Sequence, residues 1–417
     1  EQIETPTKVE ADLLNGINKV SCGGGHTLLL DGEGKLYACG WNFKLQLGTD
    51  EYSNNFQRVW SLSGVKFINI TCGWDFSCGV TDDHFLFVWG SNSHGQLGLP
   101  KEHFSENVKP IKLQVNACAI AMGLRHSVVI NSKGEVWSTG CGKHGQLGLG
   151  KDVLASDRFQ KVPNTGKISH IACGQNHTVA WCSDEKAIYV WGDNKHGQLF
   201  LDIEKYKKIF IPQKIDICVK QNVKKLLSGW TNILLWLEDG SILTCGRNNY
   251  GQLGTNNQNC PGNIVHVNLP GYTSNNWQYI LYNRFHRKPF FITWIVSNSI
   301  QFEFIDIWSF VNSINISSAL YTILILFTDG RLVKDISVGS EHTVCLATDN
   351  TLWAWGWNEH ANTGTTSEPC VMLPTLVPIQ LQVNEVITHI YSGSAHNFVV
   401  TENSQKCDIK LKLVVKM

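Results

Sequence analysis

The chain has 417 residues, and its 35 basic and 35 acidic side chains cancel, so its charge gives no support for a nucleic acid or a membrane surface as partner. A hydrophobic content of 43%, with 37 glycines and 15 tryptophans, suits a turn-rich protein built from β-strands. The 14 cysteines form no C-x-x-C pair and no Cys/His ligand spacing, so we expect no metal and no other cofactor. Buried free thiols indicate a reducing compartment, and we expect a cytoplasmic protein with the nucleus as a second location.

One short turn recurs along the chain at intervals of about 50 residues. It begins with glycine, has histidine three positions later, and continues into an apolar run. The seven copies begin at Gly23, Gly73, Gly123, Gly174, Gly229, Gly339 and Gly393. The histidines are His26, His126, His177, His342 and His396, while Phe76 and Asn232 stand at this position in the second and fifth copies. Because they recur at one position of every unit, we expect these glycines and histidines to be structural.

A second motif, G-x-N-x-x-G-Q-L-G, follows each of the first six turns by about twenty residues. Two short strands around a tight turn connect the two motifs, as in Thr27–Leu30 and Lys35–Cys39 around Asp31–Gly34. The glycines of the second motif permit left-handed turns, its Asn and Gln can bond loop backbone groups, and its Leu can anchor the loop. The copies are Cys39–Gly48, Trp89–Gly98, Thr139–Gly148, Trp191–Phe200, Cys245–Gly254 and, less regular, Trp355–Gly364.

An outer strand and an approach strand complete each unit, as in Val108–Val115 and Ala117–Ala121. Four short antiparallel strands repeated radially form the blade of a β-propeller. We therefore predict one all-β domain over residues 1–417, a seven-bladed β-propeller with four-stranded blades of about 50 residues.

The last unit is short of one loop, because nothing like the second motif follows His396. We expect the missing loop to belong upstream of residue 1, so that the closing blade lacks an N-terminal segment. The alternating run Ile409–Val415 is a candidate for a closing strand.

Residues 275–327 interrupt the repeat with a run rich in Ile, Phe, Trp, Asn and Ser. Pro289, Glu303 and Asp306 break this run, and it never reaches the roughly 18–20 apolar residues that a transmembrane helix needs. We predict a non-repeat insertion within one blade and no membrane insertion. The alternative is that this segment is translated non-coding sequence and not a functional insertion.

Enzyme chemistry finds little support, since the chain has no GK[ST] phosphate loop, no G-x-S-x-G and no H-E-x-x-H. We assign no catalytic residues and expect binding instead, because the turns of a propeller carry recognition on a fixed scaffold. The two residues between glycine and histidine vary from turn to turn, and we predict that they form a partner-binding ring around one mouth of the channel. The alternative is that they are solvated turn residues. The residues we single out are Trp74, Asp75, Arg125, Gln175, Asn176, Trp230 and Glu341.

The second candidate for binding is the set of loops that contain Lys143, Lys195 and Asn249, which we place on the opposite face. If the ring did not bind a partner, these loops would be the binding site instead.

The pairing of W-G-x-N-x-x-G-Q-L-G with G-x-x-H resembles the regulator of chromosome condensation repeat family. Strings such as Cys72–Phe76, Gly123–His126 and Trp191–Leu199 are similar to the guanine nucleotide exchange factors of that family. The resemblance implies a propeller that binds a small GTPase and loosens its nucleotide without a covalent step. It also implies a role in secretion and exocytosis, with an exocyst component as a further partner, and we expect a monomer. An interaction scaffold of the same fold without exchange activity is the alternative.

Overall fold

The computed structural model describes residues 7–9, 16–100, 102, 107–217, 221–256, 262, 264–267, 269, 276–277, 293–296, 299–302, 333–365, 368–403 and 408–415. The chain divides into two compact units. The first comprises Glu1–Ile217, Gln221–Asn268 and Val333–Met417, and the second comprises Cys218–Lys220 and Leu269–Leu332.

The second unit contains the predicted insertion, 275–327, most of which lies outside the described residues. Its described part is a three-stranded antiparallel sheet of β22 (Asn276–Trp277), β23 (Thr293–Val296) and β24 (Ser299–Phe302). Within the described ranges, no helix is both long enough and apolar enough to cross a membrane.

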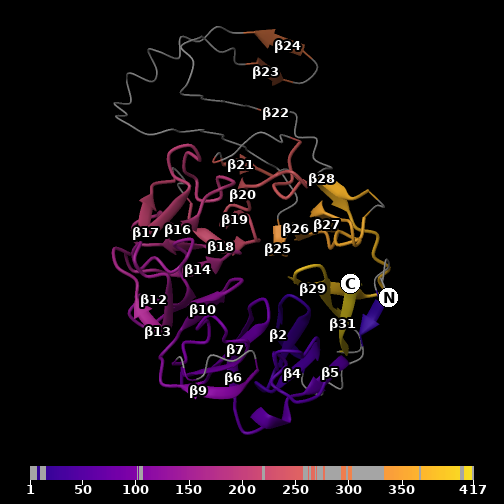
Figure 1. Cartoon of the computed structure of the whole chain (residues 1–417). Helices are drawn as coiled ribbons and strands as arrows, with labels where there is room; N and C mark the ends of the chain where they lie inside the picture. The colour runs from indigo at the N-terminus through magenta and orange to yellow at the C-terminus, as the bar shows by residue number, and fades with distance from the viewer. Residues whose placement is uncertain are drawn as a thin grey trace. The chain divides into compact units, whose positions relative to one another are not determined.

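The first unit is a β-propeller, in which six sheets are each made of four consecutive antiparallel strands (Figure 1). We call these sheets blades 1 to 6. Blades 1 to 3 comprise β2 (Ile17–Cys22), β3 (His26–Asp31), β4 (Leu36–Gly40) and β5 (Ser53–Arg58); β6 (Phe67–Cys72), β7 (Phe76–Thr81), β8 (Leu86–Gly90) and β9 (Val108–Leu113); and β10 (Ala119–Met122), β11 (His126–Ile130), β12 (Val136–Cys141) and β13 (Ala155–Lys161). Blades 4 to 6 comprise β14 (His170–Cys173), β15 (His177–Cys182), β16 (Ala187–Asp193) and β17 (Lys208–Ile215); β18 (Val223–Ser228), β19 (Asn232–Leu237), β20 (Ile242–Gly246) and β21 (Val265–His266); and β25 (Val333–Val338), β26 (His342–Ala347), β27 (Leu352–Trp357) and β28 (Cys370–Leu376). One short 3-10 helix, η1 (Trp60–Leu62), connects blades 1 and 2.

A further four-stranded sheet, which we call the closing sheet, joins strands from both ends of the chain. It contains β29 (Glu385–Ser392), β30 (Asn397–Asn403) and β31 (Asp408–Val415), and β1 (Thr7–Val9) pairs with β31. β29 contacts β25 of blade 6 and β2 of blade 1, so this sheet lies between the last and the first blade. The predicted propeller of four-stranded blades is confirmed. Instead of seven like units, however, it has six blades of consecutive strands and one sheet of mixed origin.

The predicted closing strand, Ile409–Val415, lies within β31. It pairs with β30 on one side and with β1 on the other, so the C-terminal run supplies a central strand of the closing sheet. Its alternating pattern is what a strand with two unlike faces requires.

The core lies between neighbouring sheets. Every residue of β3, β7, β15, β19 and β26 is buried, because these second strands are covered on both faces. Leu28 and Leu30 of blade 1, for example, pack in one cluster with Phe67 and Ile70 of blade 2. Burial of such side chains stabilises each interface between sheets by roughly 2 kcal/mol per side chain.

The turns and the loops share one end of the propeller. Because consecutive strands are antiparallel, the turn after the first strand and the loop after the third strand of a blade lie at the same end. The backbone shows it directly, since Trp41 N donates to Gly25 O (2.8 Å) and Cys141 N donates to Arg125 O (2.8 Å). We call this end the turn face. The expectation that the loops with Lys143, Lys195 and Asn249 lie on the opposite face is therefore wrong.

A proline in the closing strand should destabilise the propeller. Lys412 of β31 pairs with Lys8 on one side and Val399 on the other. Because proline lacks the N–H group and is excluded from central strands, we expect Lys412→Pro to lower the free energy of unfolding by about 2 kcal/mol in urea titrations.

Two variants serve as controls for this prediction. Lys412→Ala keeps the backbone hydrogen bonds, and Val383→Pro places proline at a compatible position. Val383 follows Gln382, whose carbonyl accepts the N–H of Glu385 (3.0 Å), and Asn384 has a φ of 66°, as in a type II turn. Both controls should stay near wild-type stability. Equal stability of Lys412→Pro would show that β31 is not needed to close the ring.

Candidate functional site

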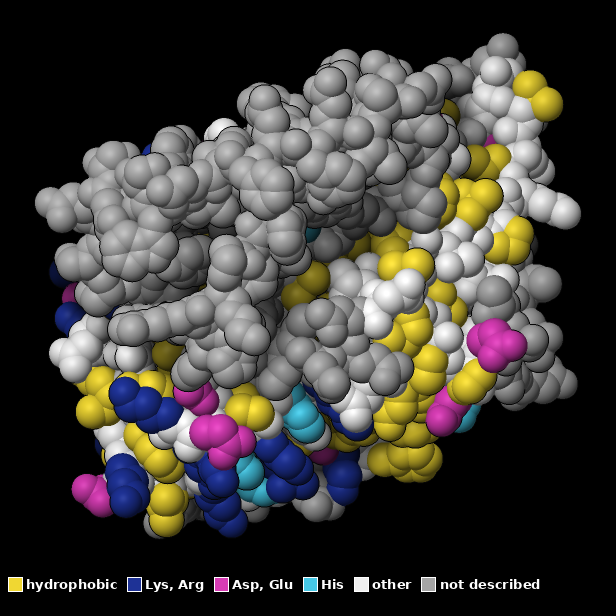
Figure 2. Space-filling model, turned by 90° about the horizontal axis from the view of Figure 1, so that it is seen from above, with side chains coloured by type: hydrophobic (Ala, Val, Ile, Leu, Met, Phe, Trp, Pro, Cys, Tyr) yellow, Lys and Arg dark blue, Asp and Glu magenta, His cyan; other side chains and the backbone are white. Residues whose placement is uncertain are grey.

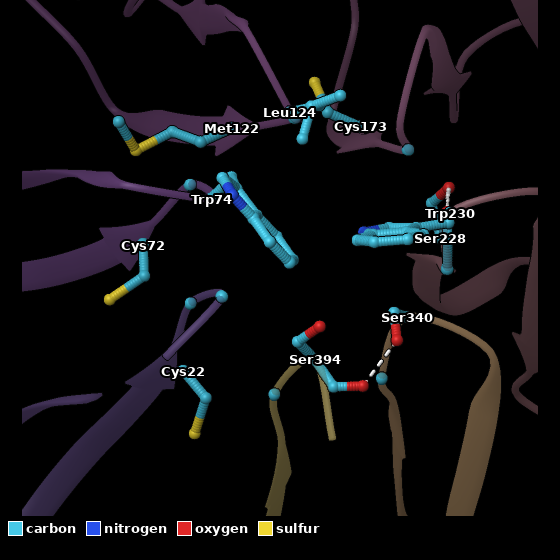
Figure 3. A pocket seen from close by; sticks show the side chains of 18 of the residues that line it. Cys22, Cys72, Trp74, Met122, Leu124, Cys173, Ser228, Trp230, Ser340 and Ser394 are labelled. Carbon is cyan, nitrogen blue, oxygen red and sulfur yellow. Dashed lines mark hydrogen bonds between the residues drawn. The ribbon is translucent and has the colours of Figure 1, made fainter. Parts of the chain in front are cut away.

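The seven turns meet around one cavity of about 160 Å³ (Figure 3). Neighbouring turns are bonded through their backbones, as from Gly24 N to Trp74 O (2.9 Å) and from Ser394 N to Gly23 O (3.2 Å). The second of these bonds connects the closing sheet with blade 1. All seven turn glycines line the cavity: Gly23, Gly73, Gly123, Gly174, Gly229, Gly339 and Gly393.

Sterics explain why each turn begins with glycine. A Cβ atom on Gly174 would lie 2.0 Å from Cε1 of His177, and one on Gly123 would lie 2.3 Å from Cε1 of His126. The histidine ring therefore lies directly against the glycine backbone, and no larger residue fits. In the other five turns, a Cβ atom on the glycine would likewise lie 2.2 to 2.4 Å from the side chain three positions later. The pairs are Gly23 with His26, Gly73 with Phe76, Gly229 with Asn232, Gly339 with His342 and Gly393 with His396.

The turn histidines also connect neighbouring sheets. Nε2 of His26 lies 2.8 Å from Oγ of Ser77, and Nε2 of His177 lies 2.9 Å from Oγ of Ser228. The remaining pairs are His126 with Thr178 (3.0 Å), His342 with Asn397 (2.8 Å) and His396 with Thr27 (3.0 Å).

Burial keeps these rings neutral. It lowers the pKa of His26, His126 and His177 to about 3 and that of His342 to about 4. A buried neutral ring with a fixed partner is poorly suited to proton transfer near pH 7. These contacts are those expected of structural residues.

The first middle residue lines the cavity in six of the seven turns, Gln175 of blade 4 being the exception. Trp74 of blade 2 and Trp230 of blade 5 point toward each other across it, with ring centroids 5.1 Å apart and planes at 55° (Figure 3). Such a tilted contact stabilises an aromatic pair. At this position in blade 4, Gln175 donates its backbone N–H to Trp230 O (3.0 Å). The corresponding lining residues of other sheets are Gly24, Leu124, Ser340 and Ser394.

The second middle residue lies beside the loop of its own blade. Its carbonyl accepts the N–H of a residue at the start of that loop, as from Ser91 to Asp75 (3.1 Å) and from Asp193 to Asn176 (2.8 Å). Asp75 and Asn176 are half-buried, while Arg125 is exposed. The predicted pairs therefore split, with one member facing the axis and the other facing the loops.

Glu341 differs most from the expected ring position. Its side chain is only 7% exposed, and its carboxylate accepts hydrogen bonds from Thr231 Oγ1 (3.1 Å) and Gln252 Nε2 (2.6 Å). Burial raises its pKa, against the effect of these bonds and of Arg247. Glu341 thus connects blade 6 to blade 5 and does not stand on an accessible ring.

The loop of blade 1 carries two aromatic side chains that the sequence analysis missed. Trp41 is 50% exposed and Phe43 is 79% exposed on the turn face. A comparison of the loops would have found them, because blade 2 has Ser91 and Ser93 at the same positions. Together with Trp74 and Trp230 they form what we call the aromatic patch.

Gly24 and Gly25 make room for this patch. A Cβ atom on Gly24 would lie 2.8 Å from the ring of Trp74, and one on Gly25 would lie 2.5 Å from the ring of Trp41. The run of three glycines in the first turn is therefore explained by close approach of two tryptophans to the backbone.

Basic side chains border the aromatic patch. Arg125, Lys143 and Lys195 are exposed on the turn face. Burial lowers the pKa of His94, and Arg125 and Lys143 lower it further. Burial raises the pKa of Asp75, whereas a hydrogen bond with Ser91 and the positive charges of Lys44 and Arg125 lower it. Asp75 and Arg125 therefore lie within electrostatic range of each other. In Figure 2, Lys, Arg and His side chains gather along one edge of the described surface, with a few acidic groups among them.

The cavity is suited to binding rather than to covalent chemistry. Burial raises the pKa of the cavity thiols Cys72 and Cys173 to about 12, and that of Cys22 well above its usual range. They are therefore thiols and not nucleophilic thiolates at neutral pH. Across the described ranges, no group of three His, Cys, Asp or Glu residues is placed to hold a metal ion.

Comparisons with known proteins agree with this architecture. Residues 1–286 match the family model of the RCC1-like domain, and residues 333–361 match that of the regulator of chromosome condensation (RCC1) repeat. The chain is 29% identical over 378 residues to the secretion-regulating guanine nucleotide exchange factor of Bos taurus, and this alignment covers 87% of this chain and 71% of that protein. It is 30% identical over 281 residues to the ultraviolet-B receptor UVR8 of Arabidopsis thaliana, and this alignment covers 64% of this chain and 62% of that protein.

Solved structures show the same fold. Prp20p from Saccharomyces cerevisiae aligns with a TM-score of 0.67 at 20% identity, over 96% of this chain and 83% of that chain. Human WBSCR16 aligns with a TM-score of 0.66 at 20% identity, over 99% of this chain and 90% of that chain.

Proposed function

Because this chain belongs to the RCC1-like domain family, we propose that it is a protein-binding propeller that acts as a guanine nucleotide exchange factor for a small GTPase. The observation that carries the proposal is the aromatic patch on the turn face, bordered by basic side chains. Two relatives support it by name, a secretion-regulating guanine nucleotide exchange factor and an X-linked retinitis pigmentosa GTPase regulator.

The patch has the chemistry of a protein interface. Tryptophan, tyrosine and arginine dominate the energetics of protein interfaces, and Trp41 and Phe43 offer exposed apolar area beside the basic border. The exposed Arg125 and Lys143 would steer an acidic partner surface onto it. We therefore place the GTPase on the turn face, over blades 1 to 3.

Exchange needs no covalent step in this scheme. A protein that binds the nucleotide-free GTPase more tightly than the loaded form weakens nucleotide binding by the same factor. The turn face would hold the GTPase with its nucleotide and magnesium site distorted, and the released site would refill from solution.

The cellular setting belongs to the same proposal. Similarity to the secretion-regulating exchange factors favours a role in secretion and exocytosis, with an exocyst component as a further partner. We further propose a protein of the cytoplasm and nucleus, because its buried free cysteines suit a reducing compartment, and one that acts as a monomer.

The release of a preloaded fluorescent GDP from a panel of small GTPases tests this proposal. Acceleration of release from one GTPase by catalytic amounts of the propeller would support exchange activity. Binding of a GTPase without accelerated release would instead favour the scaffold of the same fold. Absence of both would overturn the assignment to GTPases.

The aromatic patch should carry much of the binding energy. We expect Trp41→Ala/Phe43→Ala to weaken capture of the GTPase about thirtyfold, because loss of a hot-spot anchor costs about 2 kcal/mol. Both side chains are exposed, so the fold should be retained, and titration calorimetry measures the affinity. Trp60→Ala is the matched control, because Trp60 is 67% exposed in η1 at the other end of blade 1. Equal losses in both variants would remove the patch from the interface.

A further inference from the structure

A repeated irregularity shapes the inside of the propeller. In five sheets the innermost strand has a β-bulge at the same place relative to its turn. The residue that follows the bulge lies four positions before the turn glycine. A bulge of this kind re-aims the side chain that follows it. The residues so placed are Lys19, Asn69, Lys225, Asp335 and His389. Innermost strands border the central channel, so these polar residues form one level beside it, where four side chains are half-buried and that of His389 is exposed. None of the five is among the residues that line the cavity.

Charge at this level is unevenly neutralised. Lys225 Nζ lies 3.0 Å from Oδ1 of Asp335 and 2.8 Å from the carbonyl oxygen of Ile336, so its ammonium group has a carboxylate partner. Lys19 instead donates to the neutral side-chain oxygen of Asn69. Among the described residues, no carboxylate lies within ion-pair distance of Lys19.

The surroundings penalise the charge on Lys19. Burial, and then the nearby Lys225, lower its pKa to about 8, while Cys72 opposes this shift. Lys19 is thus still mostly protonated at pH 7, although its side chain is half-buried. An ammonium group that has lost part of its hydration is stabilised when an anion comes into contact with it.

We propose that the channel binds one small oxyanion, of the phosphate or sulfate type, at Lys19. The ammonium group of Lys19 and the side-chain amide of Asn69 would donate to the oxyanion, and Lys225 would add attraction at longer range. The strands that carry these residues belong to blades 1, 2 and 5, so the ion would also connect opposite parts of the ring.

Calorimetric titration of the whole protein with sulfate tests the proposal without any GTPase. We expect one sulfate per chain. Lys19→Met should lower the affinity at least about tenfold, because it removes the charged donor. Asn69→Asp should lower it similarly, because the new carboxylate would take the place of the anion while the lysine is kept.

Lys109→Met is the matched control. Lys109 is an exposed lysine of blade 2 that already pairs with Asp50 (2.9 Å), so its removal should leave sulfate binding unchanged. Circular dichroism establishes that each variant is folded.

A pH series sharpens the test, because sulfate keeps its charge between pH 6 and 9. Affinity should fall as the pH rises through about 8, where Lys19 of the free protein loses its proton. The neighbouring groups are not expected to cause this fall, since burial raises the pKa of Cys72 to about 12 and Lys225 remains paired with Asp335.

Two results would overturn the proposal. One is the absence of saturable sulfate binding by the wild-type protein. The other is equal affinity in wild type and in folded Lys19→Met, which would place any bound anion elsewhere.

Discussion

Gly174→Ala should destabilise the propeller by about 4 kcal/mol, the largest effect that we expect from adding a single methyl group. The new Cβ atom would lie 2.0 Å from Cε1 of His177 and 2.7 Å from the carbonyl oxygen of Gly229 in the next blade. The imidazole must therefore move and lose its contact with Ser228 Oγ, which leaves buried polar atoms without partners. Urea unfolding followed by tryptophan fluorescence measures the loss.

Two comparisons separate sterics from a general cost of replacing glycine. Gly64→Ala should change stability by less than about 0.5 kcal/mol, since a Cβ atom there meets nothing within 4 Å. Gly174→Ala/His177→Ala should be less destabilised than the sum of its single variants, because removing the ring makes space for the methyl group. Additive losses would show that the ring does not impose glycine at this position.

Acid should unfold the protein over a narrow range, because four buried histidines stay neutral in the folded state. Above a pKa of about 6.5 both the folded and the unfolded chain hold neutral histidines, so these groups contribute no pH dependence. Below it only the unfolded chain takes up protons until the pH approaches about 3 to 4, so stability falls as the pH falls. At pH 5.5 the loss is about 1.4 kcal/mol per histidine, or about 6 kcal/mol for the four.

Urea midpoints at pH 7.5, 6.5 and 5.5 measure this dependence. Glu341 and Asp75 act in the opposite direction, because burial raises the pKa of both carboxyl groups, but they are two groups against four histidines. His126→Asn is the informative variant, since blade 5 already has Asn232 at this position. We expect it to be less stable at pH 7.5 and to lose about a quarter of the acid sensitivity. Equal stability at pH 7.5 and 5.5 in the wild type would contradict the neutral state of these rings.

The sequence by itself determined what depends on local spacing. The period of the turns and loops predicted four-stranded blades, and the alternation of Ile409–Val415 predicted a closing strand. Glycine and histidine of one turn meet within four residues of chain, so their repetition identified them as structural before any contact was known. These features follow from the strand period and from turn chemistry, which act over a few residues.

Only the tertiary structure decided which repeats face each other. Trp74 and Trp230 meet because blades 2 and 5 lie across the channel, and Glu341 is buried because Thr231 and Gln252 of blade 5 reach its carboxylate. Lys19 lacks a carboxylate among the described residues because Asn69 is its neighbour on blade 2, whereas Lys225 has Asp335. Each of these contacts joins residues of two different blades that are at least fifty positions apart in the sequence. Ring closure creates them, and the period of a single repeat carries no information about its partners across the ring.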